Sequence, residues 1–193
     1  MRTTAVENAA LSLAALGLGL MAGFFATYTI NVNLALAQVD GSTYATVQSL
    51  LNQTVRHPAF GVLFFGGVAA PAAALALNWR HAASAPFWLL ATGAAIYLVG
   101  VVVFTANVHL PLNMYIESWD PPALPSDWAA TRAAWNQANA VRAGSAALAF
   151  LLTLAALTFR ALPASVGSEP PPPDASPFPA ADHPAGCASA RSR

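Results

Sequence analysis

Charged side chains are scarce in this chain, and their scarcity indicates its class. Only 8% of the 193 residues are Asp, Glu, Lys or Arg, whereas 56% are hydrophobic. Soluble domains carry about 25% charged residues, so the composition indicates a membrane protein. The net charge is zero and no basic patch exists, which argues against nucleic acid as a partner.

Cysteine and the common nucleotide-binding motifs are also missing or nearly so. The single cysteine, Cys187, excludes an internal disulfide, a CxxC redox centre and a cysteine-based metal cluster. The sequence has no glycine-rich phosphate-binding motif and no evident internal repeat.

The few charges leave four long uncharged gaps. These gaps lie between Glu7 and Asp40, between Arg56 and Arg80, between Arg80 and Glu117, and between Arg142 and Arg160. Each can hold a spanning helix of about 20 residues, the last with help from residues before Arg142. We therefore predict an all-α fold, an integral membrane four-helix bundle with spans near 9–30, 59–79, 86–107 and 138–159.

The two ends of the chain carry separate expectations. The apolar stretch 9–30 is longer than a signal-peptide core of about 7–15 residues, so we favour a retained first helix over a cleaved signal peptide. After the transmembrane domain, residues 1–160, the segment 161–193 contains eight prolines and little that could form a core. It is expected to be a disordered tail.

Arginines favour one side of the predicted membrane domain. Arg2, Arg80 in the second connection, and Arg160 and those beyond it lie on this side, whereas Arg56 and Arg132 lie deeper in helical segments. The positive-inside rule then places both termini in the cytoplasm, and we expect a bacterial cell membrane. The long connections, 31–58 and 108–137, would share the outer face.

Each long connection contains a structural signal. Residues 42–56 have no helix breaker before Pro58, so they predict a short extra helix capped by Ser42. In the other connection, Pro111 is expected to break the third span or to kink it at its outer end.

The most informative segment is 126–142, which runs into the last span. Trp128, Arg132, Trp135, Asn139 and Arg142 are spaced four, three, four and three residues apart. At about 100° per residue they form one stripe of a helix, for which Ser126 is the expected cap. Arg and Asn are costly at membrane depth unless they face a partner or a wet cavity, so the stripe is a site candidate.

Arg142 is the member of this stripe that most needs a partner. It lies about ten residues, or roughly 15 Å, further along the helix than Arg132. A buried guanidinium requires a carboxylate or several carbonyl acceptors. The carboxylates of the third connection, Glu117, Asp120 and Asp127, could fold onto it.

Polar side chains gather at the same ends of all four predicted spans. They are Tyr28, Asn31 and Asn33 on the first span, Arg56 and His57 on the second, Asn107, His109 and Asn113 on the third, and the stripe on the fourth. In a bundle these groups would surround a pocket with an apolar floor, aromatic walls and a polar mouth, the usual form of a small-molecule site.

Structural interpretations remain open for several of these residues. His57 could lie in the lipid headgroup zone, and His109 could bind carbonyls freed by Pro111. Trp128 and Trp135 could belong to an interfacial aromatic belt, and Arg132 could reach the headgroups by snorkelling.

A metal site is the other chemistry to consider at this end. His57 and His109 with Glu117 or Asp120 could bind iron or copper, but their spacing carries no metal signature. A bis-histidine haem would need histidines deeper in the bilayer. We therefore expect no metal, with iron or copper through the two histidines as the alternative.

The pattern resembles the small four-span membrane proteins that include the fungal anthrone oxygenases. The resemblance covers about residues 9–160. It rests on NVHLPLN from Asn107 to Asn113 and on W-x3-R-x2-W-x3-N-x2-R from Trp128 to Arg142. The first-span segment GFFATYTINVNLAL and the helix start at His57 and Pro58 are also similar.

The resemblance implies a monooxygenase that converts an anthrone to an anthraquinone with O₂ and without flavin or metal. Such an enzyme needs a base, for which His109 is the first candidate and His57 the second. The candidate oxyanion donors are Asn107, Asn113, Asn139 and Arg142. Trp128 and Trp135 would offer flat surfaces to a tricyclic substrate. Asn31 and Arg132 complete the expected substrate-binding set.

Two other functions remain open from the sequence. A non-enzymatic bundle could bind a hydrophobic small molecule or a partner protein with the same polar mouth but no acid–base group. Histidines that point into the lipid headgroup region would favour that interpretation. A quinone- or haem-binding redox subunit is the third possibility. The sequence does not define the natural substrate or the oligomeric state.

Overall fold

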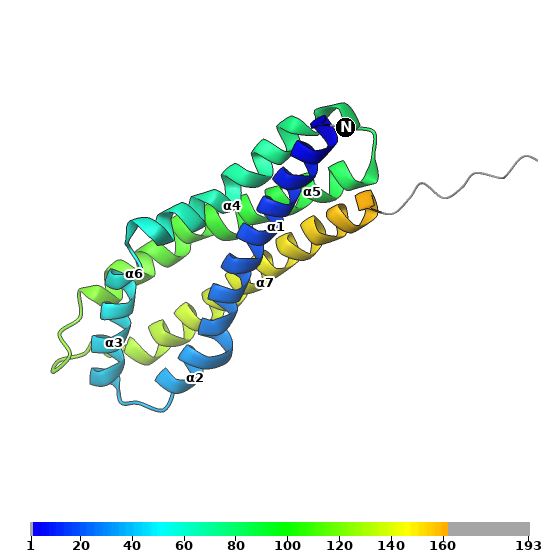
Figure 1. Ribbon diagram of the computed structural model, residues 1–193. Helices are drawn as coiled ribbons and strands as arrows, with labels where there is room; N and C mark the ends of the chain where they lie inside the picture. The colour runs from blue at the N-terminus through cyan, green and yellow to red at the C-terminus, as the bar shows by residue number, and fades with distance from the viewer. Residues whose placement is uncertain (1, 162–193) are drawn as a thin grey trace, which may run out of the picture. The chain divides into compact units, whose positions relative to one another are not determined.

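The protein is an all-helical integral membrane bundle over residues 2–161, the part of the chain that this computed structural model describes (Figure 1). Four stretches are long and apolar enough to cross a membrane: Thr4–Leu36, Pro58–Leu77, Ala85–Glu117 and Trp128–Ala161. The predicted fold class and the number of spans are confirmed. The first, third and fourth stretches extend well beyond the predicted bounds. The expected disordered tail lies outside the described residues, apart from Ala161, which ends the last helix.

Short irregular segments interrupt or link the spanning helices. In chain order the elements are α1 (Arg2–Thr27), the π-helical η1 (Tyr28–Val32), α2 (Asn33–Leu36), α3 (Gly41–Thr54), α4 (Pro58–Leu77), the 3-10 turn η2 (Trp79–His81), α5 (Ala85–Tyr97), the π-helical η3 (Leu98–Val103) and η4 (Thr105–His109), α6 (Leu110–Glu117) and α7 (Trp128–Ala161).

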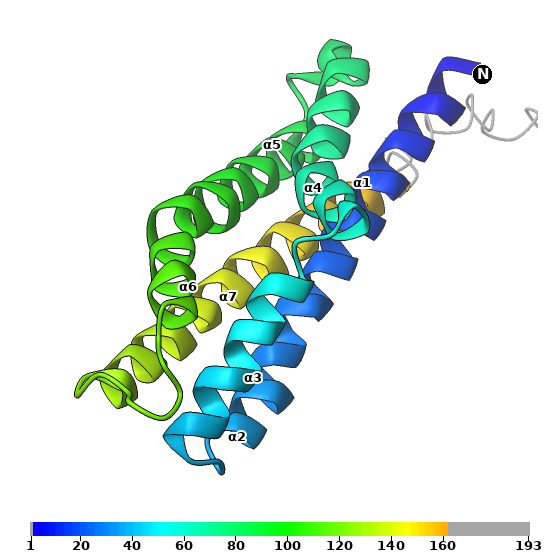
Figure 2. The same ribbon diagram turned by 90° about the vertical axis from the view of Figure 1, so that its left-hand side faces the viewer.

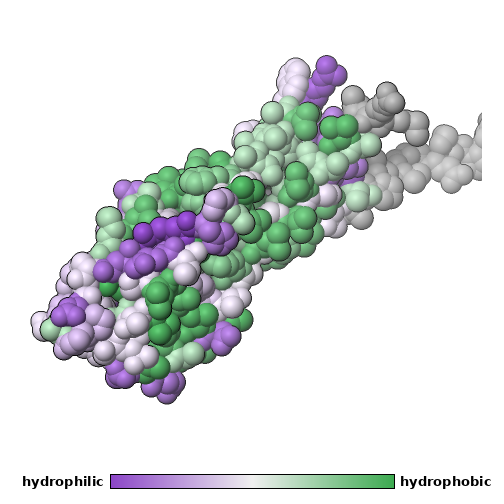
Figure 3. All heavy atoms as spheres, turned by 60° about the vertical axis from the view of Figure 1, so that its left-hand side comes forward, coloured by the Kyte–Doolittle hydropathy of each residue, from purple (hydrophilic) through white to green (hydrophobic). Residues whose placement is uncertain are grey.

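Successive spans run in opposite directions, so that α1, α4, α5 and α7 form a closed ring of antiparallel neighbours (Figure 1). Hydrophobic residues cover much of the visible face of this bundle, whereas hydrophilic residues gather towards the end that holds α2, α3 and α6 (Figure 3). A lipid-facing flank with polar side chains near one end is the arrangement that the sequence predicts.

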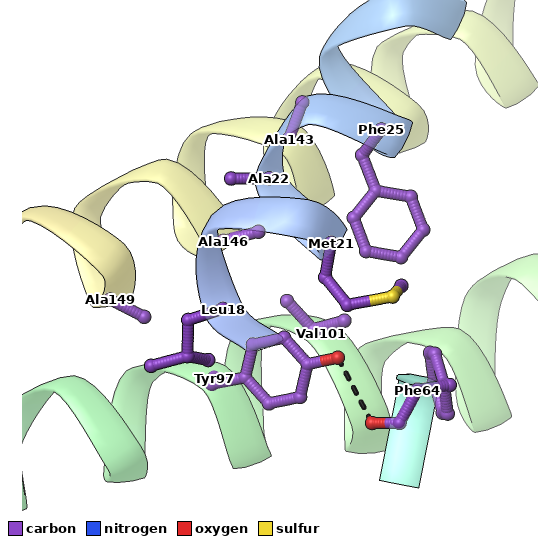
Figure 4. Close-up of a cluster of buried hydrophobic side chains, with 10 residues drawn as sticks. All are labelled: Leu18, Met21, Ala22, Phe25, Phe64, Tyr97, Val101, Ala143, Ala146 and Ala149. Carbon is purple, nitrogen blue, oxygen red and sulfur yellow. Dashed lines mark hydrogen bonds between the residues drawn. The ribbon is translucent and has the colours of Figure 1, made fainter. Parts of the chain in front are cut away.

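Small residues on α7 let its neighbours approach closely. Ala143, Ala146 and Ala149 are buried against the side chains of α1, α4 and the third span, including Leu18, Met21 and Phe64 (Figure 4). Membrane helices lack a hydrophobic force that would drive them together, so close contact between small residues supplies packing energy instead.

Tyr97 lies within this cluster. Its ring is fully buried, and its hydroxyl donates a hydrogen bond to the Phe64 carbonyl at 3.0 Å (Figure 4). The ring lies where a side chain of Gly67 would be, because a Cβ at that position would come within 2.5 Å of Tyr97 Cζ. Glycine is therefore required at residue 67 by the close approach of α4 to Tyr97.

The third span bends but does not break near Pro111. Pro111 lies in the first turn of α6, directly after the π-helical segments η3 and η4. Proline removes a backbone donor, and wider π-helical turns are a recognised way to accommodate such irregularities. Figure 2 shows the third span running away from α4 along α5 and then bending before it reaches α6. The kink was thus predicted correctly, and the helix continues to Glu117.

The short helix of the first connection is confirmed, but its cap is not Ser42. α3 begins at Gly41, and the carboxylate of Asp40 accepts hydrogen bonds from Thr43 N at 2.9 Å and from Thr43 Oγ1 at 3.0 Å. Asp40 has the extended backbone that a cap needs, whereas Ser42 already lies inside the helix.

The start of the striped helix needs a similar correction. α7 begins at Trp128, so the residue directly before it is Asp127 and not Ser126. The Asp127 carbonyl accepts from Thr131 N at 2.9 Å, and its carboxylate accepts from Thr131 Oγ1 at 3.4 Å.

Candidate functional site

A pocket of about 570 Å³ lies at the end of the bundle that holds α3. This volume falls within the range of about 300–1,000 Å³ that is usual for small-molecule sites. Four of the five groups that line it come from the spans, and the fifth comes from the end of α3 and the short link to α4. The lining residues are Phe24, Phe25 and Tyr28; Leu51, Asn52, Val55, Arg56 and His57; Pro58, Phe60, Gly61, Phe64 and Phe65; Thr105, Leu110 and Asn113; and Trp135 and Arg142.

The pocket opens sideways between α4 and the start of α6. Phe65 and Leu110 line it, yet their exposed fractions are 63% and 44% on the flank of the bundle. The third span has already diverged from α4 at this level (Figure 2). The opening therefore faces the region that lipid would occupy around these apolar spans.

The predicted stripe of α7 faces inward. Trp135, Asn139 and Arg142 are buried. The Trp135 indole N–H donates to Asn113 Oδ1 at 2.7 Å. The Asn139 amide donates to the Phe25 carbonyl at 3.2 Å and to Thr29 Oγ1 at 3.0 Å. These bonds link the first, third and fourth spans around the pocket.

Arg142 is a buried cation whose hydrogen bonds go to neutral groups. Its side chain donates to Asn139 Oδ1 at 2.8 Å and to Thr105 Oγ1 at 3.5 Å. Its Cζ lies 4.3 Å from the centroid of the Phe25 ring, and its Nε has no hydrogen-bond partner in the described part of the chain. Arg142 therefore presents an uncompensated positive charge to an apolar pocket.

The expectation that a carboxylate of the third connection pairs with Arg142 is wrong. Within residues 2–161, Glu117 forms its ion pair with Arg56, and Asp127 accepts a hydrogen bond from the Tyr115 hydroxyl at 2.9 Å. Asp120 is exposed. These residues remain at the end of the bundle, whereas Arg142 lies about 15 Å along α7 from Arg132, which explains why they do not reach it.

The two candidate histidines have different surroundings. His57 is exposed and lines the pocket, and its Nδ1 caps α4 by accepting the Phe60 N–H at 3.4 Å. His109 is fully buried and does not line the pocket. Its ring packs against Phe104 and, at a centroid distance of 5.4 Å, against Trp135. Neither ring nitrogen has a hydrogen-bond partner among the residues that the structure describes.

Four of the predicted site residues line the pocket: His57, Asn113, Trp135 and Arg142. Asn139 is buried and orients Arg142 from outside the lining. Asn31 and Asn107 are exposed, and the Asn107 amide donates to the Val103 carbonyl at 2.8 Å.

Arg132 and Trp128 also lie outside the pocket lining and join neighbouring elements instead. The Arg132 Cζ lies 4.9 Å from the Trp128 ring centroid and 5.6 Å from that of Tyr44. The guanidinium also donates to the Leu36 carbonyl at 3.3 Å. Arg132 thus holds α2 and α3 against α7.

Sequence reasoning missed the polar contribution of α3. Gln48 and Asn52 are buried one turn apart, and Asn52 lines the pocket. Together with Tyr44 they recur at intervals of four residues, which is the signal that could have shown one face of α3 turned inward.

The described residues offer no ready-made metal site. No three His, Cys, Asp or Glu side chains lie together anywhere in residues 2–161.

Comparison with known proteins identifies a family. No curated protein and no solved structure matches the chain. The profile of one family, described as anthrone oxygenase, matches residues 54–152, which include α4, the bent third span and most of the inward stripe of α7. The matched residues span half of the chain and contribute most of the pocket walls. The chain therefore belongs to the anthrone oxygenase family.

Proposed function

We propose that this protein is a membrane-embedded oxygenase that uses O₂ to oxidise an anthrone-type or other electron-rich polycyclic aromatic substrate. The observation that carries the proposal is Arg142, a buried cation that lines an aromatic pocket and, within residues 2–161, hydrogen-bonds only to neutral groups. Membership of the anthrone oxygenase family also supports an oxygenase function.

The charge of Arg142 suits the anion formed from an anthrone. Loss of a proton from the anthrone methylene gives a carbanion that is also an aromatic phenolate, so the negative charge resides largely on oxygen. A positive group in a dry, apolar pocket stabilises such an oxyanion far more than it would in water. Asn139 and Thr105 orient the guanidinium towards this task.

The pocket walls suit a flat, apolar substrate. Phe24, Tyr28, Phe60 and Trp135 line the cavity, and their rings lie 5.2–5.8 Å apart in three tilted pairs. Aromatic faces attract a polycyclic ring in offset or edge-on arrangements. The same apolar surroundings admit O₂ and exclude water from the reacting carbanion.

A histidine would remove the methylene proton. The sequence ranks His109 ahead of His57, but the pocket-lining position of His57 supports the reverse order. Its Nδ1 accepts a long hydrogen bond of 3.4 Å, and release of this weak bond would free the lone pair for proton transfer. His109 would then support the wall behind the pocket through Trp135.

The reaction balances without a further reductant. The carbanion adds to O₂ to form a C–O bond and a peroxide anion. The peroxide is protonated, its O–O bond breaks, and the remaining C–H proton leaves with the departing oxygen. The methylene becomes a ketone, and the overall change is R₂CH₂ + O₂ → R₂C=O + H₂O. Because the substrate supplies all the electrons, we propose that neither flavin nor metal takes part.

The membrane placement follows from the same proposal. The bilayer holds the hydrophobic substrate, and the bias of the arginines supports termini on the cytoplasmic side of a bacterial membrane.

The test uses the purified protein in detergent. Its visible spectrum and metal content are recorded first, and O₂ uptake is then followed with emodin anthrone or dithranol as substrate. We expect colourless, metal-free protein whose uptake exceeds the spontaneous rate and yields the anthraquinone. A bound chromophore, or stoichiometric iron or copper held by His57 and His109, would replace this mechanism with redox or metal chemistry. Uptake equal to the spontaneous rate would favour a non-enzymatic, ligand-binding bundle.

A further inference from the structure

A buried amide in α3 gives the pocket a further polar group, on a different helix from Arg142. Asn52 is 3% exposed and Gln48 is fully buried. The Gln48 amide donates to Asn52 Oδ1 at 2.9 Å. This bond occupies the carbonyl of Asn52 and leaves its NH₂ group, Nδ2, without a hydrogen-bond partner among the described residues.

The unpaired donor belongs to a residue that lines the pocket. Buried donors are nearly always paired in folded proteins, and an unpaired one is destabilising. A partner from the pocket would relieve this cost. Because the free group is N–H, that partner must be a hydrogen-bond acceptor.

We propose that Asn52 is a specificity-determining residue that donates a hydrogen bond to an oxygen substituent of the substrate. This inference rests on the proposed function, because it takes the ligand to be an anthrone-type molecule. Arg142 would bind the oxyanion from α7, and Asn52 would bind a second oxygen, that of a ring hydroxyl, from α3. The substrate class is then an oxygenated polycycle and not the unsubstituted ring system.

Gln48 acts as the positioning residue for this contact. It lies one turn before Asn52 and directs the Asn52 side chain through their hydrogen bond. Without it the Asn52 amide could rotate and present its carbonyl to the pocket, which would leave the substrate oxygen without a donor.

The experiment compares ligands with and without ring hydroxyl groups. Binding of 1,8-dihydroxyanthraquinone and of anthraquinone, two product-like molecules, is followed by quenching of tryptophan fluorescence in the detergent-purified protein. Oxidation of dithranol and of anthrone is measured in parallel. Asn52→Leu removes the donor at similar volume, and Gln53→Leu is the control because Gln53 is exposed on the same helix and bonds Ser49.

We expect the wild-type protein and Gln53→Leu to prefer the hydroxylated ligand. In Asn52→Leu the ratio of the affinities for the two ligands should fall about tenfold, the effect of losing one neutral hydrogen bond. Gln48→Leu should lose part of it. If Asn52→Leu does not fold, Asn52→Ala removes the donor with less bulk and should show the same loss of preference.

The outcomes separate this inference from the proposed function. An unchanged preference in Asn52→Leu overturns the role of Asn52 even if the enzyme oxidises both substrates. A lost binding preference supports that role even if the wild-type protein shows no turnover, which would contradict the proposed function alone. An equal decrease for both ligands would reflect a structural change and would also overturn the specificity role.

Discussion

The guanidinium carbon of Arg142 lies 4.3 Å from the centre of the Phe25 ring, and both side chains line the same pocket. A desolvated contact of this kind is worth about 2 kcal/mol. The ring stabilises the cation in the membrane domain but does not neutralise its charge, whereas a carboxylate would neutralise it. The positive charge consequently remains available to an anionic ligand.

Replacing Arg142 tests this charge. Arg142→Met should reduce oxygen uptake with dithranol at least about 100-fold, the usual effect of losing one oxyanion donor. Its melting temperature should stay the same or rise, because an apolar residue of similar size avoids the desolvation of a buried charge. Arg80→Met, which alters an exposed arginine at the other end of the bundle, is the control. Full activity in Arg142→Met would rule out the oxyanion role.

The two histidines can be separated by paired variants. His57→Gln should slow turnover about 100-fold, the scale of general base catalysis. His109→Leu should retain most of the activity and keep or gain stability, because it removes two buried nitrogens that have no partners. Single-turnover rates and thermal unfolding in detergent provide the measurements. The reverse ranking of the two rates would return the base role to His109.

Access from the bilayer can be tested at Gly61. A Cβ on Gly61 would meet no atom within 4 Å, so Gly61→Trp can fit and fill the mouth of the pocket. We expect kcat/KM for a lipid-dissolved anthrone in proteoliposomes to fall about tenfold, or ~1.4 kcal/mol. Val62→Trp is the matched control, because Val62 is 72% exposed on the same helix and does not line the pocket. Equal kinetics in the two variants would place the access route elsewhere.

Neighbouring glycines of α4 should respond differently to alanine. Gly67→Ala should lower the free energy of unfolding by about 1–3 kcal/mol, because the new methyl group would overlap the buried Tyr97 ring. Gly66→Ala should be neutral or slightly stabilising, since nothing lies within 4 Å of its Cβ position. Chemical or thermal denaturation in detergent compares them. Equal stability of the two variants would contradict the close approach of Gly67 to the Tyr97 ring.

The cap of α3 should respond to acid. Hydrogen bonds from Thr43 to the carboxylate of Asp40 lower its pKa below the usual value. A group whose folded pKa is lowered stabilises the fold above its unfolded pKa, and this stabilisation is lost as the pH falls through the folded pKa. Amide hydrogen exchange at the first turn of α3 should therefore show faster opening below about pH 4. In Asp40→Asn the amide caps without titrating, so an identical pH dependence there would exclude Asp40 as the cause.

Local patterns in the sequence were sufficient to predict the bundle and the inward stripe of α7. Long uncharged gaps require spanning helices, and Trp135, Asn139 and Arg142 share one side of a helix whatever surrounds it. The bend near Pro111 and the helix after Asp40 were also predicted from local sequence signals. The exact caps were missed because Asp and Ser are both good cap residues and only the backbone conformation distinguishes them.

The pocket itself was decided by tertiary structure. The third span diverges from α4, which makes His57 a wall residue while His109 is enclosed behind the lining. The same packing keeps Glu117 on Arg56 and away from Arg142, and it turns Asn52 into the cavity. Sequence spacing determines which side chains share a helix face, but the distances between faces depend on how the helices cross and bend, and these depend on contacts between residues far apart in the chain.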